Sequence, residues 1–308
     1  MTSHLLLDTG ETAARLPYAL LVPELRGLLA DPSVVVPERL VQPLAGGGSL
    51  FVMPAMDSRI AIAKLITFTP GNAGTAHPAI QGDVVVFDVK TGARTLILDG
   101  PTVTARRTAA VSLLAAQRLA PNQGGPLLIV GAGAQGRAHL EAFAQGLSVR
   151  QVFIASRGAA GAQALATHAR SLGLQATVVT NPNEALANCS LAVTCTPAGG
   201  VVLDALPRAD AFIAAVGAFT PKMVELGPEL CRHCASHGSV IVDTPQAAHE
   251  AGDLLQAGLD VAGFATLRDV LASPQRPPAG PVLFKSCGWA GWDLAAARCA
   301  LQTPSAQD

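Results

Sequence analysis

The sequence predicts an α/β protein with two domains, one built on a parallel β-sheet and the other of α+β type. Two observations lead to this prediction. From residue 126 to about residue 274, short apolar runs alternate with helical segments, which is the pattern of a doubly wound parallel sheet. Between residues 34 and 100, apolar runs follow one another with only turns between them, as in an antiparallel sheet. With 308 residues, the chain is long enough for two cores.

The N-terminal part is expected to combine strands with two helices. An apolar stripe from Leu16 to Leu29 predicts the first helix, and a second is expected over Thr104–Leu119. The segment Lys90–Ala93 contains glycine and separates two apolar runs, which predicts a hairpin turn. The strands are expected at His4–Leu7, Val34–Val36, Ser49–Met53, Ile60–Phe68, Gly82–Asp88 and Thr95–Asp99.

The parallel sheet is expected to take its strands from the following part of the chain. A proline-rich linker, Pro274–Pro281, ends this part, and the last helix, Ala290–Leu301, is expected to return to the first domain. We therefore assign residues 1–113 and 285–308 to one domain and residues 114–284 to the other. The expected strands are Leu127–Val130, Val152–Ala155, Gln175–Val179, Leu191–Thr194, Ala211–Ala215 and Ser239–Asp243.

One stretch, residues 126–136 with the sequence PLLIVGAGAQG, joins the first of these strands to a helix over residues 137–145. Strand, Gly-x-Gly-x-x-Gly and helix in this order form the fingerprint of a Rossmann dinucleotide-binding domain. Gly131 permits the tight turn, Gly133 lets the backbone approach a pyrophosphate, and Gly136 lets the helix pack close to the strand. The helix N-terminus attracts phosphate. The alternative is a glycine-rich turn without a ligand.

The next strand indicates which dinucleotide is bound. An NAD site places an acid at its end to bind the ribose 2′-hydroxyl. Here the strand ends with Ser156 and Arg157, and the next acid along the chain is Glu184. Arg157 suits a 2′-phosphate, so we expect NADPH, with NADH as a possible second cofactor. The alternative is that Arg157 is a solvated surface charge.

Composition excludes several classes of function. The chain is 50% hydrophobic and 14% charged, its formal net charge is −1, and its cations are scattered, so neither nucleic acid nor a membrane is expected as a partner. The start of the sequence lacks the basic and apolar regions of a signal peptide, which predicts a cytoplasmic protein with reduced cysteines. Cys231, Cys234 and His237 lack a second ligand pair, so no metal is expected. The apolar surplus suggests a surface buried between subunits.

Three cations of the first domain lie among apolar or small residues. They are Arg39, Lys64 and Arg107. Lysine inside an apolar strand is costly to bury unless it meets an anion, and arginine can bind a carboxylate through two parallel hydrogen bonds. Together they could clamp a small acid. The alternative is three independent cations whose charged ends reach solvent.

The chain resembles the ornithine cyclodeaminase/μ-crystallin family over nearly its whole length. The resemblance implies a Rossmann domain and a split α+β substrate domain through which two subunits form a homodimer. It also implies that Arg39, Lys64 and Arg107 hold a substrate carboxylate, with Lys64 either contacting that carboxylate or relaying a proton. To the cofactor it assigns Arg107, Thr108, Gly131, Gly133, Ala134, Gln135, Gly136, Ser156, Arg157, Thr196, Val216 and Ser286. The segments that carry it are Ala63–Leu65, Thr91–Gly92, Leu98–Gly100, Thr104–Ala110, Gly131–Gly136, Cys195–Ala198, Val242–Asp243, Glu250–Leu254 and Phe284–Gly288.

One departure from the family selects among its activities. The cyclodeaminases carry an aspartate in a loop after a Rossmann strand, and Phe219 occupies that position here. A phenyl ring can neither accept a proton nor stabilise an ammonium group as a carboxylate would. The chain therefore resembles the branch that reduces Δ1-pyrroline-2-carboxylate to proline and Δ1-piperideine-2-carboxylate to pipecolate. An amino-acid dehydrogenase and a non-catalytic NADPH-binding protein are the alternatives. The acids Asp243, Glu250, Asp253 and Asp293 are expected to be structural.

Overall fold

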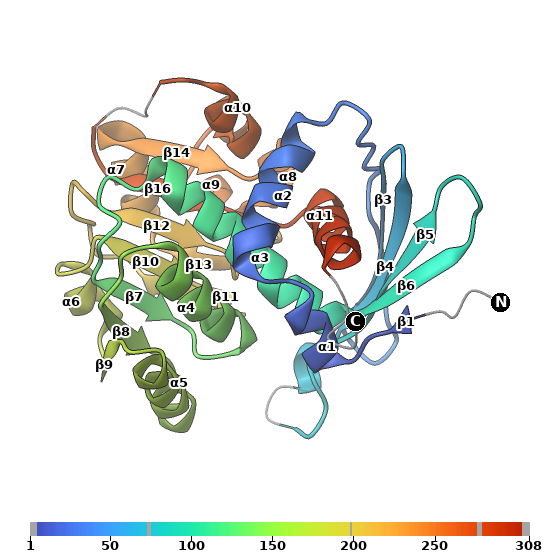
Figure 1. Cartoon of the computed structure of the whole chain (residues 1–308). Coiled ribbons are helices and arrows are strands. Elements are labelled where there is room, and N and C mark those ends of the chain that lie inside the picture. Colours follow the sequence, from blue (N-terminus) through green and yellow to red (C-terminus); the bar gives the residue numbers. More distant parts are fainter. Residues whose placement is uncertain (1–4, 73–74, 198, 276–278, 304–308) are drawn as a thin grey trace. The chain divides into compact units, whose positions relative to one another are not determined.

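The computed structural model describes residues 5–72, 75–197, 199–275 and 279–303 (Figure 1), and the chain forms two compact units. Unit 1 comprises Met1–Arg107 and Trp289–Asp308, and unit 2 comprises Thr108–Gly288. Three predictions fall partly outside the described residues: the first expected strand at residue 4, the family-like segment 195–198 at residue 198, and the expected linker at residues 276–278.

Unit 1 is built on a six-stranded sheet with the order β1-β6-β5-β4-β3-β2. All neighbouring strands are antiparallel except β1 and β6, which are parallel. The strands are β1 (Leu5–Leu6), β2 (Leu40–Pro43), β3 (Ser49–Met56), β4 (Ile60–Phe68), β5 (Ile80–Asp88) and β6 (Arg94–Asp99). The helical elements are α1 (Thr9–Ala14), α2 (Tyr18–Ala30), the 3₁₀ turn η1 (Pro70–Asn72), the first residues of α3 (Gly100–Leu119) and α11 (Ala290–Gln302).

The core of unit 1 lies between its sheet and α11. Along β4, residues 60, 62, 64 and 66 are buried and the residues between them are more exposed, as expected for a strand with one covered face. Helix α11 contacts both α2 and the strands β3 and β4 (Figure 1). Apart from Asp293, Arg298 and Gln302 it is built of apolar or small residues, and it contains Trp292, one of the largest fully buried side chains. A helix of this kind is stable only when it is buried.

Unit 2 is built on an eight-stranded parallel sheet with the order β15-β14-β16-β12-β10-β7-β8-β9. A small second sheet pairs β11 with β13. The strands are β7 (Leu127–Val130), β8 (Gln151–Ala155), β9 (Gln175–Val178), β10 (Leu191–Thr194), β11 (Gly199–Leu203), β12 (Phe212–Ala215), β13 (Val224–Leu226), β14 (Ser239–Val242), β15 (Ala265–Thr266) and β16 (Val282–Lys285). The helical elements, after the rest of α3, are α4 (Ala134–Gly146), α5 (Ala159–Ser171), α6 (Pro182–Leu186), α7 (Pro228–His237), α8 (Ala247–Glu250), α9 (Gly252–Gln256), η2 (Val261–Gly263) and α10 (Leu267–Ala272).

The central strands of unit 2 are buried on both faces. All residues of β7, β10, β12 and β16 are buried, which is typical of a parallel sheet with helices on both sides. From β7 the chain continues to β8 and β9 on one side, and then to β10 and β12 on the other. The point where the order reverses, between β7 and β10, is where such folds bind ligands. The predicted fold class, with a parallel and an antiparallel sheet, is confirmed.

Some predicted elements were wrong. Residues 34–36 do not form a strand, because only Val35 makes an isolated bridge, with Met56, and Pro32 and Pro37 flank it. Five strands of the structure were not predicted: β2, β11, β13, β15 and β16. Among the described residues, no helix has both the length and the apolar character needed to cross a lipid bilayer.

Candidate functional site

The residues predicted to bind the cofactor in unit 2 cluster at one edge of the parallel sheet. Carboxyl ends of neighbouring parallel strands lie at the same edge, where α/β proteins bind nucleotides. Backbone hydrogen bonds join these ends directly: Gly131 N donates to Ala155 O (2.9 Å), Cys195 N to Val130 O (2.9 Å), Val216 N to Thr194 O (2.9 Å), and Ser286 N to Ala215 O (3.0 Å). The edge therefore carries, from β8 to β16, Ser156 and Arg157, then Gly131–Gly136, then Thr196, Val216 and Ser286.

Each glycine of the fingerprint occupies a different environment. Gly131 has a φ of +117°, and a Cβ there would lie 2.8 Å from the carbonyl oxygen of Cys195. A Cβ on Gly136 would overlap the carbonyl oxygen of Gly131, whereas a Cβ on Gly133 would meet no protein atom within 4 Å. Gly133 is also the N-cap of α4, and no side chain caps this helix. The N-terminus of α4, which begins with Ala134 and Gln135, thus presents backbone N–H groups to open space, as a phosphate site requires.

A buried histidine holds the first turn of α4 in place. The side chain of His139 is fully buried, and its Nδ1 lies 2.8 Å from the carbonyl oxygen of Gln135. Its Nε2 lies 2.9 Å from the hydroxyl of Ser112 on α3. Because a carbonyl can only accept, Nδ1 carries the hydrogen and Nε2 accepts from Ser112. Burial lowers the pKa of His139 to about 4, so the ring is neutral near pH 7.

The residues that follow β8 face solvent. Ser156 is partly buried, and Arg157 is exposed. Within the described part of the chain, Arg157 makes neither an ion pair nor a hydrogen bond, so its guanidinium is available to an anion. Thr108, which was also assigned to the cofactor, is buried at the point in α3 where unit 2 begins.

Glu225 on β13 orients the loops after β10 and β12. Its buried carboxylate accepts hydrogen bonds from Thr194 Oγ1 (3.1 Å), Gly217 N (2.7 Å), and both the N and Oγ1 of Thr196. Burial raises the pKa of Glu225, while Lys285 and the Thr196 donors oppose that rise. Both hydrogen-bond donors of Thr196 are thus engaged by Glu225. Sequence reasoning did not identify Glu225, although a lone acid between Val224 and Leu226 could have suggested it.

Two further buried aspartates support the same edge of unit 2. Asp253 accepts from Leu226 N (2.9 Å) and pairs with Lys285 Nζ (2.6 Å), which also donates to Ala218 O. Burial opposes the charge of Lys285, but Asp253 and other nearby groups raise its pKa. Asp243 accepts from the hydroxyl of Ser286 (2.8 Å) and from the backbone N–H groups of residues 287 and 288. Both aspartates therefore order backbone around predicted cofactor residues.

In unit 1, the three predicted clamp cations are accompanied by an acid. Lys64 lies in the middle of β4, on the face covered by α11, and its Nζ is 2.9 Å from Asp293 Oδ1. The same oxygen lies 3.2 Å from Nε of Arg107. Arg39 directly precedes β2, and its Cζ lies 6.0 Å from the ring centroid of Phe51 on β3. Three cations and one carboxylate leave this cluster, hereafter the cation cluster (Arg39, Lys64, Arg107 and Asp293), with a net positive charge.

The charge of Lys64 depends on its neighbours. Burial lowers its pKa most strongly, Asp293 raises it, and the positive charges of Arg107 and Arg39 lower it, with a net value of about 8. Asp293 had been expected to be structural, and sequence reasoning did not place it beside Lys64. The available signal was its position as the single acid in a mostly apolar helix, where a buried carboxylate requires a cationic partner.

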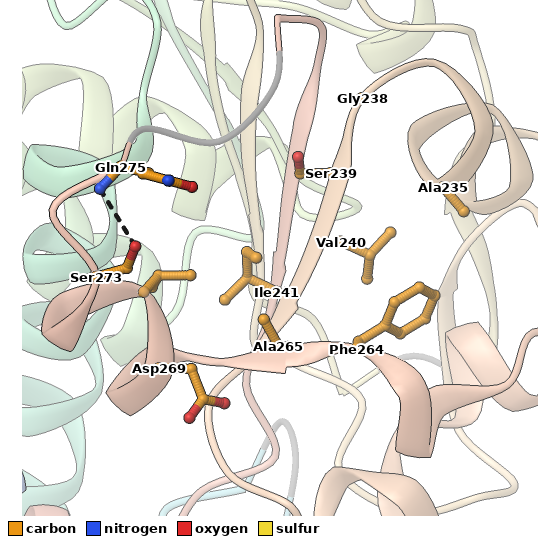
Figure 2. A pocket seen from close by; sticks show the side chains of 11 residues that line it. Ala235, Gly238, Ser239, Val240, Ile241, Phe264, Ala265, Asp269, Ser273 and Gln275 are labelled. Carbon is orange, nitrogen blue, oxygen red and sulfur yellow. Dashed lines mark hydrogen bonds between the residues drawn. The ribbon is translucent and has the colours of Figure 1, made fainter.

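A cavity of about 450 Å³ in unit 2 is lined by residues that were not predicted to belong to the site (Figure 2). It borders β14, β15 and α10, and Val240, Ile241 and Phe264 are among its lining residues. In the sheet, β14 and β15 lie beyond β16, so β16, β12 and β10 separate the cavity from the fingerprint turn after β7. Among the described residues, no group of three or more His, Cys, Asp and Glu side chains is arranged to hold a metal ion. The cysteines are free and buried.

Comparison with known proteins gives a consistent result. The model of the ornithine cyclodeaminase/mu-crystallin family matches residues 30–305. The Δ1-pyrroline-2-carboxylate reductase 2 of Burkholderia ambifaria is 37% identical over 95% of this chain and 94% of its own length. The Δ1-pyrroline-2-carboxylate/Δ1-piperideine-2-carboxylate reductase of Azospirillum brasilense is 38% identical, with the same coverage. The structure of Thermococcus litoralis Δ1-pyrroline-2-carboxylate reductase with NADH and L-proline superposes with a TM-score of 0.88, at 23% identity and 96% coverage of both chains.

Proposed function

Because the chain belongs to the ornithine cyclodeaminase/mu-crystallin family, we propose that it reduces cyclic ketimine carboxylates with a nicotinamide dinucleotide. The products are L-proline from Δ1-pyrroline-2-carboxylate and L-pipecolate from Δ1-piperideine-2-carboxylate. Relatives with these activities are 37–38% identical over almost the whole chain. In the structure, the observation that carries the proposal is the cation cluster, in which Lys64, Arg107 and Asp293 are buried, the net charge is positive and a lysine can exchange a proton.

We assign substrate binding to unit 1. Arg107 reaches Asp293 through Nε, and its two Nη atoms make no hydrogen bond to the described residues. Those two nitrogens form the fork that binds a carboxylate with two parallel hydrogen bonds. Arg39 and Lys64 add positive charge, which favours an anionic substrate. A clamp of this kind would fix the direction of the imine bond, which is catalysis by orientation.

We assign cofactor binding to unit 2, and propose NADPH over NADH. The support is Arg157, which is exposed, follows β8, and has no acid beside it in the sequence. Ala155, two residues before Arg157, accepts a hydrogen bond from Gly131 N, so the residues after β8 lie next to the fingerprint turn. When bound, the reduced cofactor supplies a hydride to the imine carbon. The residues of the chain then have to hold both partners and provide a proton for the nitrogen.

Ornithine cyclodeamination has less support than imine reduction. It would require a carboxylate near the substrate amine, and Phe219 stands where the cyclodeaminases carry that aspartate. Its ring is partly buried against the core of unit 2. The next acid along the chain is Glu225, and its carboxylate is already occupied by hydrogen bonds from Thr194, Thr196 and Gly217. A buried carboxylate in this state is a poor partner for a substrate ammonium.

Oxidation of NADPH in the presence of different substrates tests the proposal. We expect rapid oxidation with Δ1-pyrroline-2-carboxylate, and none with ornithine. Pyruvate plus ammonia serves as the control for an amino-acid dehydrogenase. Faster turnover with that pair, or release of ammonia from ornithine, would replace the proposed activity. Tight NADPH binding without oxidation by any imine would indicate a non-catalytic binding protein.

We further propose that the protein is a homodimer formed through unit 1. The support is the outer face of its sheet, opposite the face that carries Lys64. Cross-strand partners share a face, and the row Leu40, Val52 and Leu65 joins β2, β3 and β4. Leu40 is 58% exposed and Leu65 is 43% exposed. An exposed apolar sheet face of this kind is typical of a surface that a partner covers.

A further inference from the structure

We propose that Asp293 is a positioning residue of the proposed reductase: it keeps Lys64 in the ammonium form, as the proton donor for the imine nitrogen, and aligns Arg107 for the substrate carboxylate. This inference rests on the proposed function. It concerns an acid that sequence reasoning placed among the structural residues. Three observations support it: the geometry of the shared oxygen, the state of the second oxygen, and the charges around Lys64.

A single oxygen of Asp293 serves both cations. Its Oδ1 accepts from Lys64 Nζ at 2.9 Å and from Arg107 Nε at 3.2 Å. The side chains of Lys64 and Asp293 are completely buried, and that of Arg107 is 7% exposed. Helix α11 is itself anchored, because Arg298 pairs with Asp31 (2.6 Å) and with Asp57. The carboxylate therefore has a fixed position from which it can orient both cations.

The second oxygen of Asp293 argues against a purely structural role. Oδ2 is buried and has no hydrogen-bond partner among the described residues. Buried carboxylates that only stabilise a fold have their oxygens satisfied, since each unpaired one costs free energy. A buried ion pair such as Lys64–Asp293 is also not needed for stability, because apolar residues of similar volume often do as well. The buried charge of this pair is therefore better explained by a function than by stability.

The surroundings of Lys64 show which group keeps it charged. Three elements bring charges close to it: α11 with Asp293, α3 with Arg107, and the segment before β2 with Arg39. Burial and the two arginines all lower the pKa of Lys64, and Asp293 is the group that raises it. The resulting value of about 8 leaves the lysine protonated at neutral pH, yet able to release its proton. Without Asp293, every remaining influence favours the neutral amine.

Reduction of the imine requires a proton as well as a hydride, and the proton comes from Lys64. It bonds to the lone pair of the imine nitrogen and leaves Lys64 as a neutral amine. A hydride supplied by the cofactor would form the new C–H bond at the imine carbon, and the π electrons of the C=N bond would become the lone pair of the product amine. The imine is reduced, the nicotinamide is oxidised, and Lys64 regains a proton from water. Efficient proton transfer requires a donor whose pKa is near the working pH.

NMR titration of the lysines tests the charge without any substrate. The chain has only four lysines, Lys64, Lys90, Lys222 and Lys285, so ¹³C labelling at Cε gives few signals, and Lys64→Arg identifies the one of interest. In the wild type we expect Lys64 to titrate near pH 8. In Asp293→Asn its midpoint should fall by roughly one to three pH units, because an opposing charge is lost. Glu24→Gln is the control. It removes a carboxylate of α2 that pairs with Arg298, which lies on the same helix as Asp293, and the titration midpoint of Lys64 should stay unchanged.

The pH profile of kcat provides the functional readout. Wild-type kcat should fall as pH rises through the Lys64 midpoint, and in Asp293→Asn this fall should move to lower pH together with the NMR midpoint. Asp293→Glu should restore most of the wild-type profile. If Asp293→Asn does not fold, the test rests on the NMR titrations of the wild type and of Asp293→Glu. A wild-type Lys64 midpoint near that of free lysine would then overturn the inference.

The outcomes separate the inference from the proposed function. An Asp293→Asn variant with an unchanged Lys64 midpoint would overturn the inference, as would a wild-type midpoint near that of free lysine. If the wild type reduces no imine, the proposed function fails, and the NMR result still shows whether Asp293 controls the charge of Lys64. If imine reduction is normal and the kcat profile of Asp293→Asn is unshifted, only the inference fails.

Discussion

At the scale of single residues, the proposed substrate contact depends most on Arg107. Its Nε is held by Asp293, and its two Nη atoms remain for a carboxylate. Charge-assisted hydrogen bonds contribute roughly 1.5–3 kcal/mol each. Arg107→Ala should therefore raise KM for the imino acid about ten- to a hundredfold. Steady-state kinetics with Δ1-pyrroline-2-carboxylate measures this change.

Arg59 provides a matched control for that substitution. It is an exposed arginine in the same unit. Arg59→Ala removes an equal charge and should leave KM unchanged. An Arg107→Ala enzyme with wild-type KM would remove Arg107 from the substrate site.

A second single-residue prediction concerns the choice of dinucleotide. Arg157→Asp replaces the residue proposed to bind the 2′-phosphate by an acceptor for the ribose hydroxyl, so preference should move towards NADH. Arg150 lies at the other end of β8 and is also exposed, so Arg150→Asp controls for the change in net charge. Both variants are compared by the ratio of kcat/KM for NADPH and NADH. An unchanged ratio in Arg157→Asp would mean that another residue reads the phosphate.

His139 makes stability depend on pH. Burial lowers its folded-state pKa to about 4, below the 6.5 of an exposed histidine, so the unfolded chain binds the extra proton more readily. The stabilisation that comes from keeping His139 neutral is fully present above pH 6.5. It is lost as pH falls towards 4, which lowers the free energy of unfolding by about 3 kcal/mol. The free energy of unfolding, measured by urea denaturation at several pH values in this range, should depend less steeply on pH in His139→Gln than in the wild type. The exposed His77 gives the control, and His77→Gln should retain the slope.

At the scale of elements, the junction of β7 and α4 contains two glycines with different roles: Gly133, the N-cap of α4, and Gly136, in the first turn of that helix. A Cβ on Gly136 would overlap the backbone of Gly131, whereas a Cβ on Gly133 would project into open space. Gly136→Ala should therefore lower the melting temperature. Gly133→Ala should leave the fold intact and weaken NADPH binding, because its methyl group would occupy the position of the pyrophosphate. Calorimetry and NADPH titration distinguish the two; equal loss of stability in both variants would contradict this assignment.

The elements also show which sequence signals were sufficient. The bounds of β4, β7 and β10 were predicted correctly, because each is an apolar run with polar residues or glycine at its end. Strand β16 was missed because it follows a proline-rich stretch and ends with Lys285, whose charge is stabilised only by Asp253, which lies far away in the sequence. Strand β2 was missed because its residues are all exposed and its pairing with β3 is not visible locally.

At the scale of the whole molecule, the sequence identified the fold class and the family, but not the pairing of buried charges. The fingerprint glycines are contiguous, so local pattern reveals them. Lys64 and Asp293 are 229 positions apart, and only the return of the last helix to unit 1 brings them together. The same is true of Glu225 and Thr194, whose contact depends on how β13 lies beside the large sheet. Contacts of buried charged side chains with distant segments are therefore what the sequence alone could not predict.

The assembly of the whole molecule gives the last prediction. If two copies associate through the outer sheet face of unit 1, a charge placed in the row Leu40, Val52 and Leu65 would be buried without a partner and would be strongly unfavourable. Leu65→Glu should therefore convert a dimer into monomers. Leu172 is similarly exposed, at 39%, but lies after α5 in unit 2, so Leu172→Glu should remain dimeric. Sedimentation velocity at micromolar concentration compares the three proteins. A monomeric wild type, or a Leu65→Glu variant that stays dimeric, would exclude this face as the subunit interface.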